Sequence, residues 1–133
     1  MHATAVAFGP RGGVLIIGPS GAGKSRLALA LIQNGAQLVA DDQVFLTACN
    51  NALFARTPRS IAGMIEARGV GILRMAHRHI AQISVLVELG GTSAGRMPTP
   101  QTREISGVTL PCLQGDPESP FARAVSHYIA SLT

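Results

Sequence analysis

GPSGAGKS, which spans residues 18–25, is a complete G-x-x-x-x-G-K-S phosphate-binding loop. The apolar run 13–17 before it predicts a buried strand. Residues 26–33 after it predict a helix, which Asn34-Gly35 would end with a left-handed cap. Glycines let the backbone wrap closely around an anion, so that N–H groups and the helix N-terminus point at it. The context therefore predicts a phosphate site formed by Gly18, Pro19, Ser20, Gly21, Ala22, Gly23, Lys24 and Ser25.

Two side chains of this loop have predicted roles in binding a nucleotide. The Lys24 ammonium would reach the β- and γ-phosphates, and the Ser25 hydroxyl would hold Mg²⁺. Lys24 is the only lysine in the chain, and the other ten basic residues are all arginine. A compact ammonium is thus present where a planar guanidinium would not fit. The competing interpretation is a glycine-rich turn that binds nothing, but eight matching positions and both flanks count against it.

Composition narrows the class of protein. The length of 133 residues suits one domain, covering 1–133. A net charge of +4 favours an acidic partner or a polyphosphate ligand, whereas the lack of a basic run or aromatic platform makes a nucleic-acid partner unexpected. No apolar run approaches the roughly 20 residues that span a bilayer, and no signal peptide is visible. With Cys49 and Cys112 outside any motif, we expect a cytoplasmic protein with reduced thiols.

An aspartate pair follows the next predicted strand. Residues 36–40 lead directly into Asp41 and Asp42. Ligands of open α/β sheets lie beyond the carboxyl ends of the strands, so these acids should face the phosphate loop. Such an acid can bind Mg²⁺ or accept a proton from an attacking hydroxyl. Neighbouring residues in a strand point to opposite faces, so both can reach one site only if the strand has ended. The sequence leaves open which aspartate has which role.

His2 is of interest only through a predicted hairpin. Residues 1–8 predict a short strand, and the turn 9–12 returns the chain antiparallel into the strand that feeds the loop. That pairing would bring His2 close to the phosphate loop. On position alone, a disordered terminal histidine is the better interpretation.

The middle of the chain concentrates positive charge around one acid. Five arginines and two histidines lie between Arg56 and His79, with Glu66 as the only acid. Such an acid is most often a salt-bridge partner, and composition alone favours that interpretation. Gly69 and Gly71 nearby leave room for a close approach, so a Mg²⁺ or phosphate role stays open.

Four features occur in an order that resembles a known family. They are His2, the phosphate loop, LVADD at 38–42 and IEARGVGIL at 65–73. Together they resemble the catalytic domain of the HPr kinase/phosphorylase family, in the short form without an N-terminal domain. The resemblance runs from residue 2 to about residue 75. It implies an α/β fold with a single P-loop domain, a mixed β-sheet and few helices.

The resemblance also implies an activity and roles for residues. In that family ATP phosphorylates a serine of HPr, a small phosphocarrier of the sugar phosphotransferase system. One of Asp41 and Asp42 would accept the serine proton, and His2 would match the active-site histidine. Ser25 and Glu66 would hold Mg²⁺, and Lys24 the phosphates. The family further implies assembly as a hexamer.

The C-terminal third carries one candidate residue and one departure from the family. Arg96 resembles an active-site arginine of the family and could neutralise charge on the transferred phosphoryl group, or it is simply an exposed loop arginine. Gly115-Asp116-Pro117 stands where the long-form family has a Gly-Arg-Asn motif tied to dephosphorylation. This removes a cation from the place where inorganic phosphate would bind, which counts against the phosphorylase activity.

Two further elements are predicted there. Residues 103–110 predict one strand that ends at Pro111. Ser119 and Pro120 predict a helix start, with serine as the cap and proline at the first position. The apolar face of this helix would be formed by Phe121, Val125 and Ile129.

Three functions compete at this level. The first is an HPr-type protein-serine kinase, the second a small-molecule P-loop kinase or ATPase, and the third a regulatory nucleotide-binding module without transfer. The segment around Glu66 favours the first over the second. The missing Gly-Arg-Asn motif gives some weight to the third.

Overall fold

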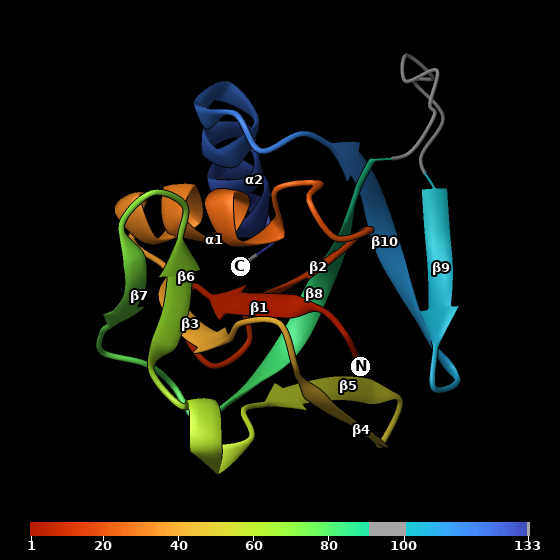
Figure 1. The fold of residues 1–133 in the computed structure, drawn as a ribbon. Helices are drawn as coiled ribbons and strands as arrows, with labels where there is room; N and C mark the ends of the chain where they lie inside the picture. Colours follow the sequence, from red (N-terminus) through yellow and green to blue (C-terminus); the bar gives the residue numbers. More distant parts are fainter. Residues whose placement is uncertain (91–100, 133) are drawn as a thin grey trace.

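The predicted strand, loop and helix form the centre of the molecule (Figure 1). A computed structural model describes residues 1–90 and 101–132. β2 (Gly13–Ile17) enters the loop, and α1 (Lys24–Gln33) leaves it. The helix begins two residues before the predicted start, because Gly23 turns the chain with φ 102°. It ends as predicted, with Gly35 in the left-handed region at φ 108°.

The main sheet is mixed, and its path runs β3-β1-β2-β8-β10-β9. β1 (Thr4–Ala7) is antiparallel to β2 and to β3 (Gln37–Ala40), which confirms the predicted N-terminal hairpin. β8 (Ile80–Leu89) runs parallel to both β2 and β10 (Val108–Gly115). Strands β3, β2, β8 and β10 therefore all end at one edge of the sheet. Residues that follow these strands meet at that edge.

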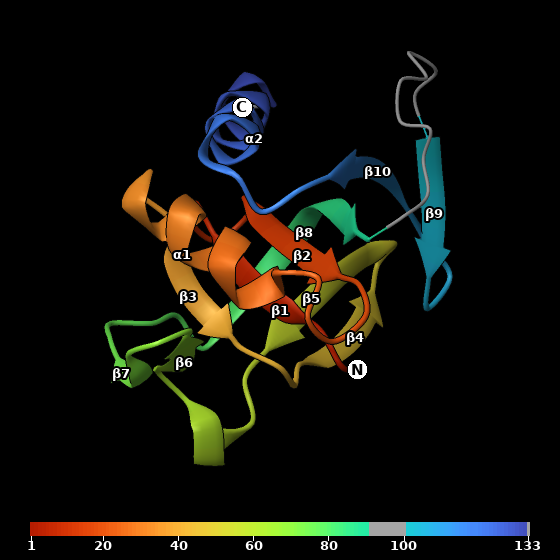
Figure 2. The same cartoon turned by 45° about the horizontal axis from the view of Figure 1, so that its top comes forward.

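Two hairpins extend this framework. β4 (Phe45–Cys49) and β5 (Ala52–Arg56) pair with each other, and β5 also pairs with the beginning of β8. After a short 3-10 helix (Arg59–Ile61), β6 (Met64–Ala67) and β7 (Gly71–Arg74) form a two-stranded sheet of their own. Figure 2 shows that hairpin beside β3 and α1. It is the element that carries Glu66.

Apolar side chains bury both faces of the central strands. On one face, α1 and α2 (Ser119–Ser131) lie over β2 and β8 (Figures 1 and 2), and Ile16, Leu27 and Ile129 share this cluster. On the other face, Leu15 and Leu86 pack with Leu53 of β5. The α2 face was predicted correctly: Val125 and Ile129 are buried there and Phe121 packs against the cluster. No helix of the described residues is long and apolar enough to cross a membrane.

The C-terminal region corrects two predictions. Residues 103–110 are not one strand, because Ser106 and Gly107 both take positive φ and form a hairpin turn between β9 (Gln101–Ile105) and β10. β10 also continues through Pro111 instead of ending there. Pro111 is tolerated because pairing with β8 begins only at the next residue, Cys112.

The second correction concerns the start of α2. The residue at the N-cap is Glu118, not Ser119, and its side chain makes no capping bond. Instead, the Asp116 carboxylate accepts a hydrogen bond from the Glu118 N–H at 2.8 Å. The turn residue just after β10 therefore organises the helix start.

Candidate active site

The loop at 18–25 depends on glycine at two positions where neighbours approach closely. A Cβ on Gly18 (φ 154°) would lie 2.8 Å from the Leu89 carbonyl oxygen, where β8 ends. A Cβ on Gly23 (φ 102°) would lie 2.8 Å from Cβ of Pro117. The loop is thus fitted between the ends of β8 and β10. Helix α1 starts there with no side-chain cap and no acid in its first turn, so its N-terminus stays suited to an anion.

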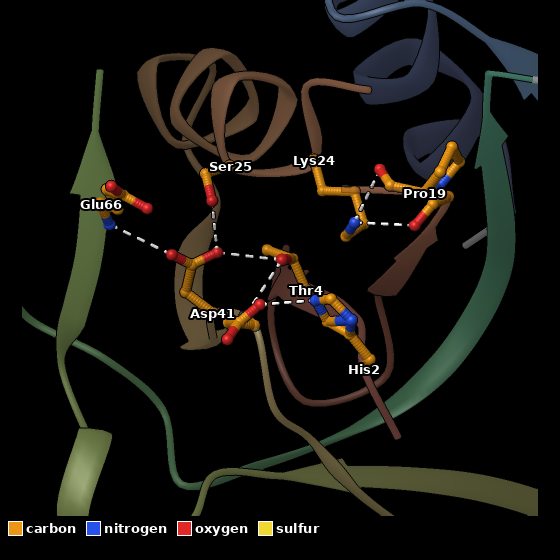
Figure 3. A network of polar contacts seen from close by, with 9 residues as sticks. His2, Thr4, Pro19, Lys24, Ser25, Asp41 and Glu66 are labelled. Atoms are coloured by element: carbon orange, nitrogen blue, oxygen red, sulfur yellow. Dashed lines mark hydrogen bonds and ion pairs between the residues drawn. The ribbon is translucent and has the colours of Figure 1, made fainter. Parts of the chain in front are cut away.

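Lys24 lies over the loop. Its ammonium donates to the carbonyl oxygens of Gly18 at 2.7 Å and Pro19 at 3.1 Å (Figure 3), and the residue is only 7% exposed. The charge is therefore held at the centre of the loop by the loop's own backbone. A bound phosphate would offer this ammonium a stronger, charged partner.

Asp41 joins three segments of the chain. Its Oδ1 accepts hydrogen bonds from the hydroxyls of Ser25 at 2.6 Å and Thr4 at 2.9 Å. Its Oδ2 accepts one from the Glu66 backbone N–H at 3.1 Å. Asp41 is 7% exposed, so both carboxylate oxygens are held in a nearly water-free position (Figure 3). The aspartate predicted to face the phosphate loop is in direct contact with it.

Asp42 lies on the same side, next to His2. β3 ends at Ala40, and Asp42 takes a left-handed conformation with φ 76°. This is the strand ending that the sequence required if both aspartates were to reach one site. Asp42 Oδ1 lies 2.6 Å from His2 Nε2, and both side chains are open to solvent. The hairpin therefore brings the terminal histidine into the site, against the interpretation from its position alone.

Glu66 reaches the site from the separate hairpin. Glu66 is exposed, and the hydrogen bond from its backbone N–H to Asp41 holds this part of β6 beside the aspartate (Figure 3). Within the described part of the chain, no cation forms an ion pair with Glu66. None of the described arginines or histidines is therefore the salt-bridge partner that composition favoured for Glu66.

The donor set around Ser25 suits Mg²⁺. Mg²⁺ prefers hard oxygen ligands and is usually held by one or two carboxylates together with waters and substrate phosphates. The Ser25 hydroxyl and the carboxylates of Asp41 and Glu66 supply such oxygens. Among the described residues no group of three or more His, Cys, Asp or Glu could hold a metal by itself. The set fits a metal that arrives with a phosphate ligand.

Two predicted features of the C-terminal third complete the comparison with the sequence. The candidate Arg96 lies outside the described residues. Gly90, which follows β8, lies against the phosphate loop, because an added Cβ there would lie 3.1 Å from Cδ of Pro19. At the end of β10, Asp116 and Pro117 lie next to the loop, and Arg26 pairs with Glu118 at 3.0 Å on the surface. Position 116 thus brings an acid, not a cation, to this edge.

A family model described as the HPr serine kinase C-terminal domain matches residues 1–90, well over half of the chain. The chain belongs to the HPr serine kinase family. The match covers the site residues from His2 to Glu66 and ends before the C-terminal third. It confirms the resemblance read from the motifs.

Two curated relatives carry the name of the same family. The HPr kinase/phosphorylase of Aromatoleum aromaticum is 41% identical over 112 residues, which cover 74% of this chain and 36% of that protein. The Clostridium beijerinckii protein of the same name is 48% identical over 61 residues, 46% of this chain and 20% of that protein. The chain thus matches little more than a third of these relatives at most.

The solved Hpr(Ser) kinase/phosphatase of Coxiella burnetii has the same fold. It superposes with a TM-score of 0.81 at 26% identity, covering 99% of this chain and 94% of that one. The match confirms the predicted α/β fold with a mixed sheet. In the described residues that sheet is accompanied by two α-helices.

One residue of the network was missed by sequence reasoning. Thr4 contacts both aspartates, since its hydroxyl donates to Asp41 and accepts the Asp42 N–H at 3.3 Å. It lies in no motif, and a threonine in a short strand is ordinary. Only the register between β1 and β3 could have indicated it.

Proposed function

We propose that this member of the HPr kinase family is a protein-serine kinase. It would transfer the γ-phosphoryl group of Mg-ATP to a serine of a small HPr-like phosphocarrier protein. The observation that carries this proposal is the contact of Asp41 with Ser25 at 2.6 Å, with Asp42 and His2 beside them. It joins a nucleotide-binding loop to an acid pair, which is what phosphoryl transfer to a hydroxyl requires.

The loop residues would bind the nucleotide. Residues 18–25 and the start of α1 would enclose the phosphates, with Lys24 exchanging its carbonyl partners for phosphate oxygens. Ser25 and Glu66 would hold Mg²⁺, with Asp41 fixing the Ser25 hydroxyl. The ion would neutralise negative charge on the β- and γ-phosphates. Arg96 stays a candidate for stabilising the transferred group.

The contacts favour Asp42 over Asp41 as the base. Asp41 accepts three hydrogen bonds on its two oxygens and is only 7% exposed, so an incoming hydroxyl has little access to its carboxylate. Asp42 is open to solvent and has His2 on one oxygen. The acceptor serine oxygen would attack the γ-phosphorus, its proton would pass to Asp42, and ADP would leave as the bond to the β-phosphate oxygen breaks. His2 would orient the Asp42 carboxylate.

The reverse, phosphorolytic activity is expected to be weak. Asp116 places a negative charge close to the end of the loop, where the family motif supplies an arginine. An extra anion there opposes binding of inorganic phosphate by Coulomb repulsion.

Transfer to a carrier separates this function from its alternatives. Purified chain, Mg-ATP and HPr from the same genome should give carrier with one added phosphoryl group, mapped by mass spectrometry to a serine. ADP release without labelled carrier would indicate an ATPase or small-molecule kinase. Bound ATP without turnover would indicate a regulatory module.

The same family membership supports two expectations about the chain in the cell. We propose a cytoplasmic protein, consistent with Cys49 and Cys112 as free thiols. We also propose assembly as a hexamer, which native mass spectrometry of the purified chain tests directly; a monomer would contradict it. A nucleic-acid partner remains unexpected.

A further inference from the structure

Thr4 is the first residue of β1, and its side chain is almost completely enclosed, with 1% of the residue exposed. The pairing of β1 with β3 contains an irregularity: Val6 is opposite Leu38, but Ala5 is opposite Ala40. One extra residue of β3 is accommodated in that step, as in a β-bulge. Just beyond this step, the side chains of Thr4 and Asp41 meet in a hydrogen bond of 2.9 Å.

The Thr4 hydroxyl is used in both directions. It donates its single proton to Asp41 Oδ1 at 2.9 Å and accepts the backbone N–H of Asp42 at 3.3 Å (Figure 3). One hydroxyl thus fixes the side chain of one aspartate and the backbone of the other. Few groups other than serine and threonine can donate and accept in this way.

We propose that Thr4 is a positioning residue for phosphoryl transfer, an inference that rests on the proposed kinase function. It acts through the two aspartates and does not contact a substrate. Its bond to Asp41 leaves that carboxylate oriented toward Ser25. Its bond to the Asp42 N–H holds the left-handed backbone at φ 76°, which turns the Asp42 carboxylate to His2.

The alternative is that Thr4 only fills space in the core. Valine has nearly the same shape and would fill the same space without the hydroxyl. Serine keeps the hydroxyl and loses a methyl group. The two substitutions therefore separate hydrogen bonding from packing at one position.

The test compares Thr4→Val and Thr4→Ser with the wild-type chain. Thr4→Val should lower kcat for transfer from Mg-ATP to HPr by about 10- to 100-fold, the usual effect of losing a group that orients active-site ligands. The Kd for a fluorescent ADP analogue should change less than about twofold, and Thr4→Ser should restore most of kcat. Thr57→Val is the matched control, because Thr57 is also buried but its hydroxyl donates to the Pro58 carbonyl; it should keep wild-type kcat.

A second measurement needs no catalysis. In Thr4→Val the Asp42 amide loses its acceptor, so its hydrogen exchange, followed by NMR, should be faster than in wild type and in Thr4→Ser. Wild-type kcat or unchanged Asp42 exchange in Thr4→Val would overturn the inference. So would equal losses of kcat in Thr4→Val and Thr4→Ser together with weakened ADP binding, which would indicate packing. If the wild-type chain does not phosphorylate HPr, the proposed function fails, while the exchange rates still test the role of Thr4.

Discussion

Adjacent aspartates of the site should respond very differently to the same substitution. Asp41→Asn keeps the size of the side chain but replaces one acceptor oxygen with an NH₂ donor. The two hydroxyls of Ser25 and Thr4 lie on one side of Asp41 and the Glu66 N–H lies on the other. If the amide nitrogen is turned toward Glu66, two N–H donors face each other. If it is turned toward Ser25 and Thr4, both hydroxyls must rotate to accept from it and lose the charged oxygen to which they now donate.

The contacts set the size of this effect. A hydrogen bond to a charged group contributes about 1.5–3 kcal/mol, and a buried N–H left unpaired costs about 1–3 kcal/mol. With Asp41 only 7% exposed, little water can replace the lost partner. We expect Asp41→Asn to lower the free energy of unfolding by about 2–4 kcal/mol. Asp42→Asn loses a solvent-exposed pair with His2, which contributes at most about 1 kcal/mol.

Urea denaturation of the wild-type chain and both variants, followed by circular dichroism, measures these differences. The m-value should stay unchanged, so that a shift of the midpoint reports stability. Asp42→Asn is the matched control, with the same chemical change one residue away. If Asp41→Asn were no more destabilising than Asp42→Asn, the three-donor arrangement around Asp41 would be refuted.

Three further predictions rest on other features of the structure. Gly23→Ala should destabilise the chain by about 1–3 kcal/mol and weaken ADP binding, because the new methyl group meets Pro117. Gly21 has φ 86° but no atom within 4 Å of an added Cβ, so Gly21→Ala should cost less stability in urea denaturation. Equal losses of stability would contradict the packing argument. Glu66→Gln should raise the Mg²⁺ concentration needed for half-maximal nucleotide binding about tenfold. The control Glu104→Gln, on exposed β9, should leave that concentration unchanged. If the two variants needed the same Mg²⁺ concentration, Glu66 would not be part of the metal site. Burial, helped by the Glu88 carboxylate and opposed by Arg103, raises the pKa of the Cys112 thiol. At mildly alkaline pH, iodoacetamide should therefore modify exposed Cys49 well before Cys112, as followed by mass spectrometry. The two thiols should react at equal rates once urea unfolds the chain.

Local sequence signals were sufficient for the centre of the fold. The loop at 18–25 has an apolar strand before it and a helix after it, and each of these is specified by a few neighbouring residues. The same holds for the hairpin that carries His2 and for the strand end that precedes Asp41. These features needed no knowledge of distant contacts.

Features set by register or by side-chain neighbours could not be predicted. The register shift between β1 and β3, next to the contact of Thr4 with Asp41, depends on how two strands pair, and nothing in either strand marks it. The Ser106-Gly107 turn was missed because Arg103 to Leu110 looked like one uninterrupted strand. The proposed choice of Asp42 over Asp41 as the base rests on hydrogen bonds that reach Asp41 from distant parts of the chain, which the sequence does not show.

In the proposed reaction, an acid beside the phosphate loop would take the proton of a protein serine as ATP phosphorylates it. Phosphoserine formation on HPr, measured together with ATP affinity for Lys24→Ala and Asp42→Asn, tests this most directly. We predict that Lys24→Ala fails to bind ATP, and that Asp42→Asn binds ATP like the wild-type chain but forms no phosphoserine. Full phosphoserine formation by Asp42→Asn would show that Asp42 is not the base.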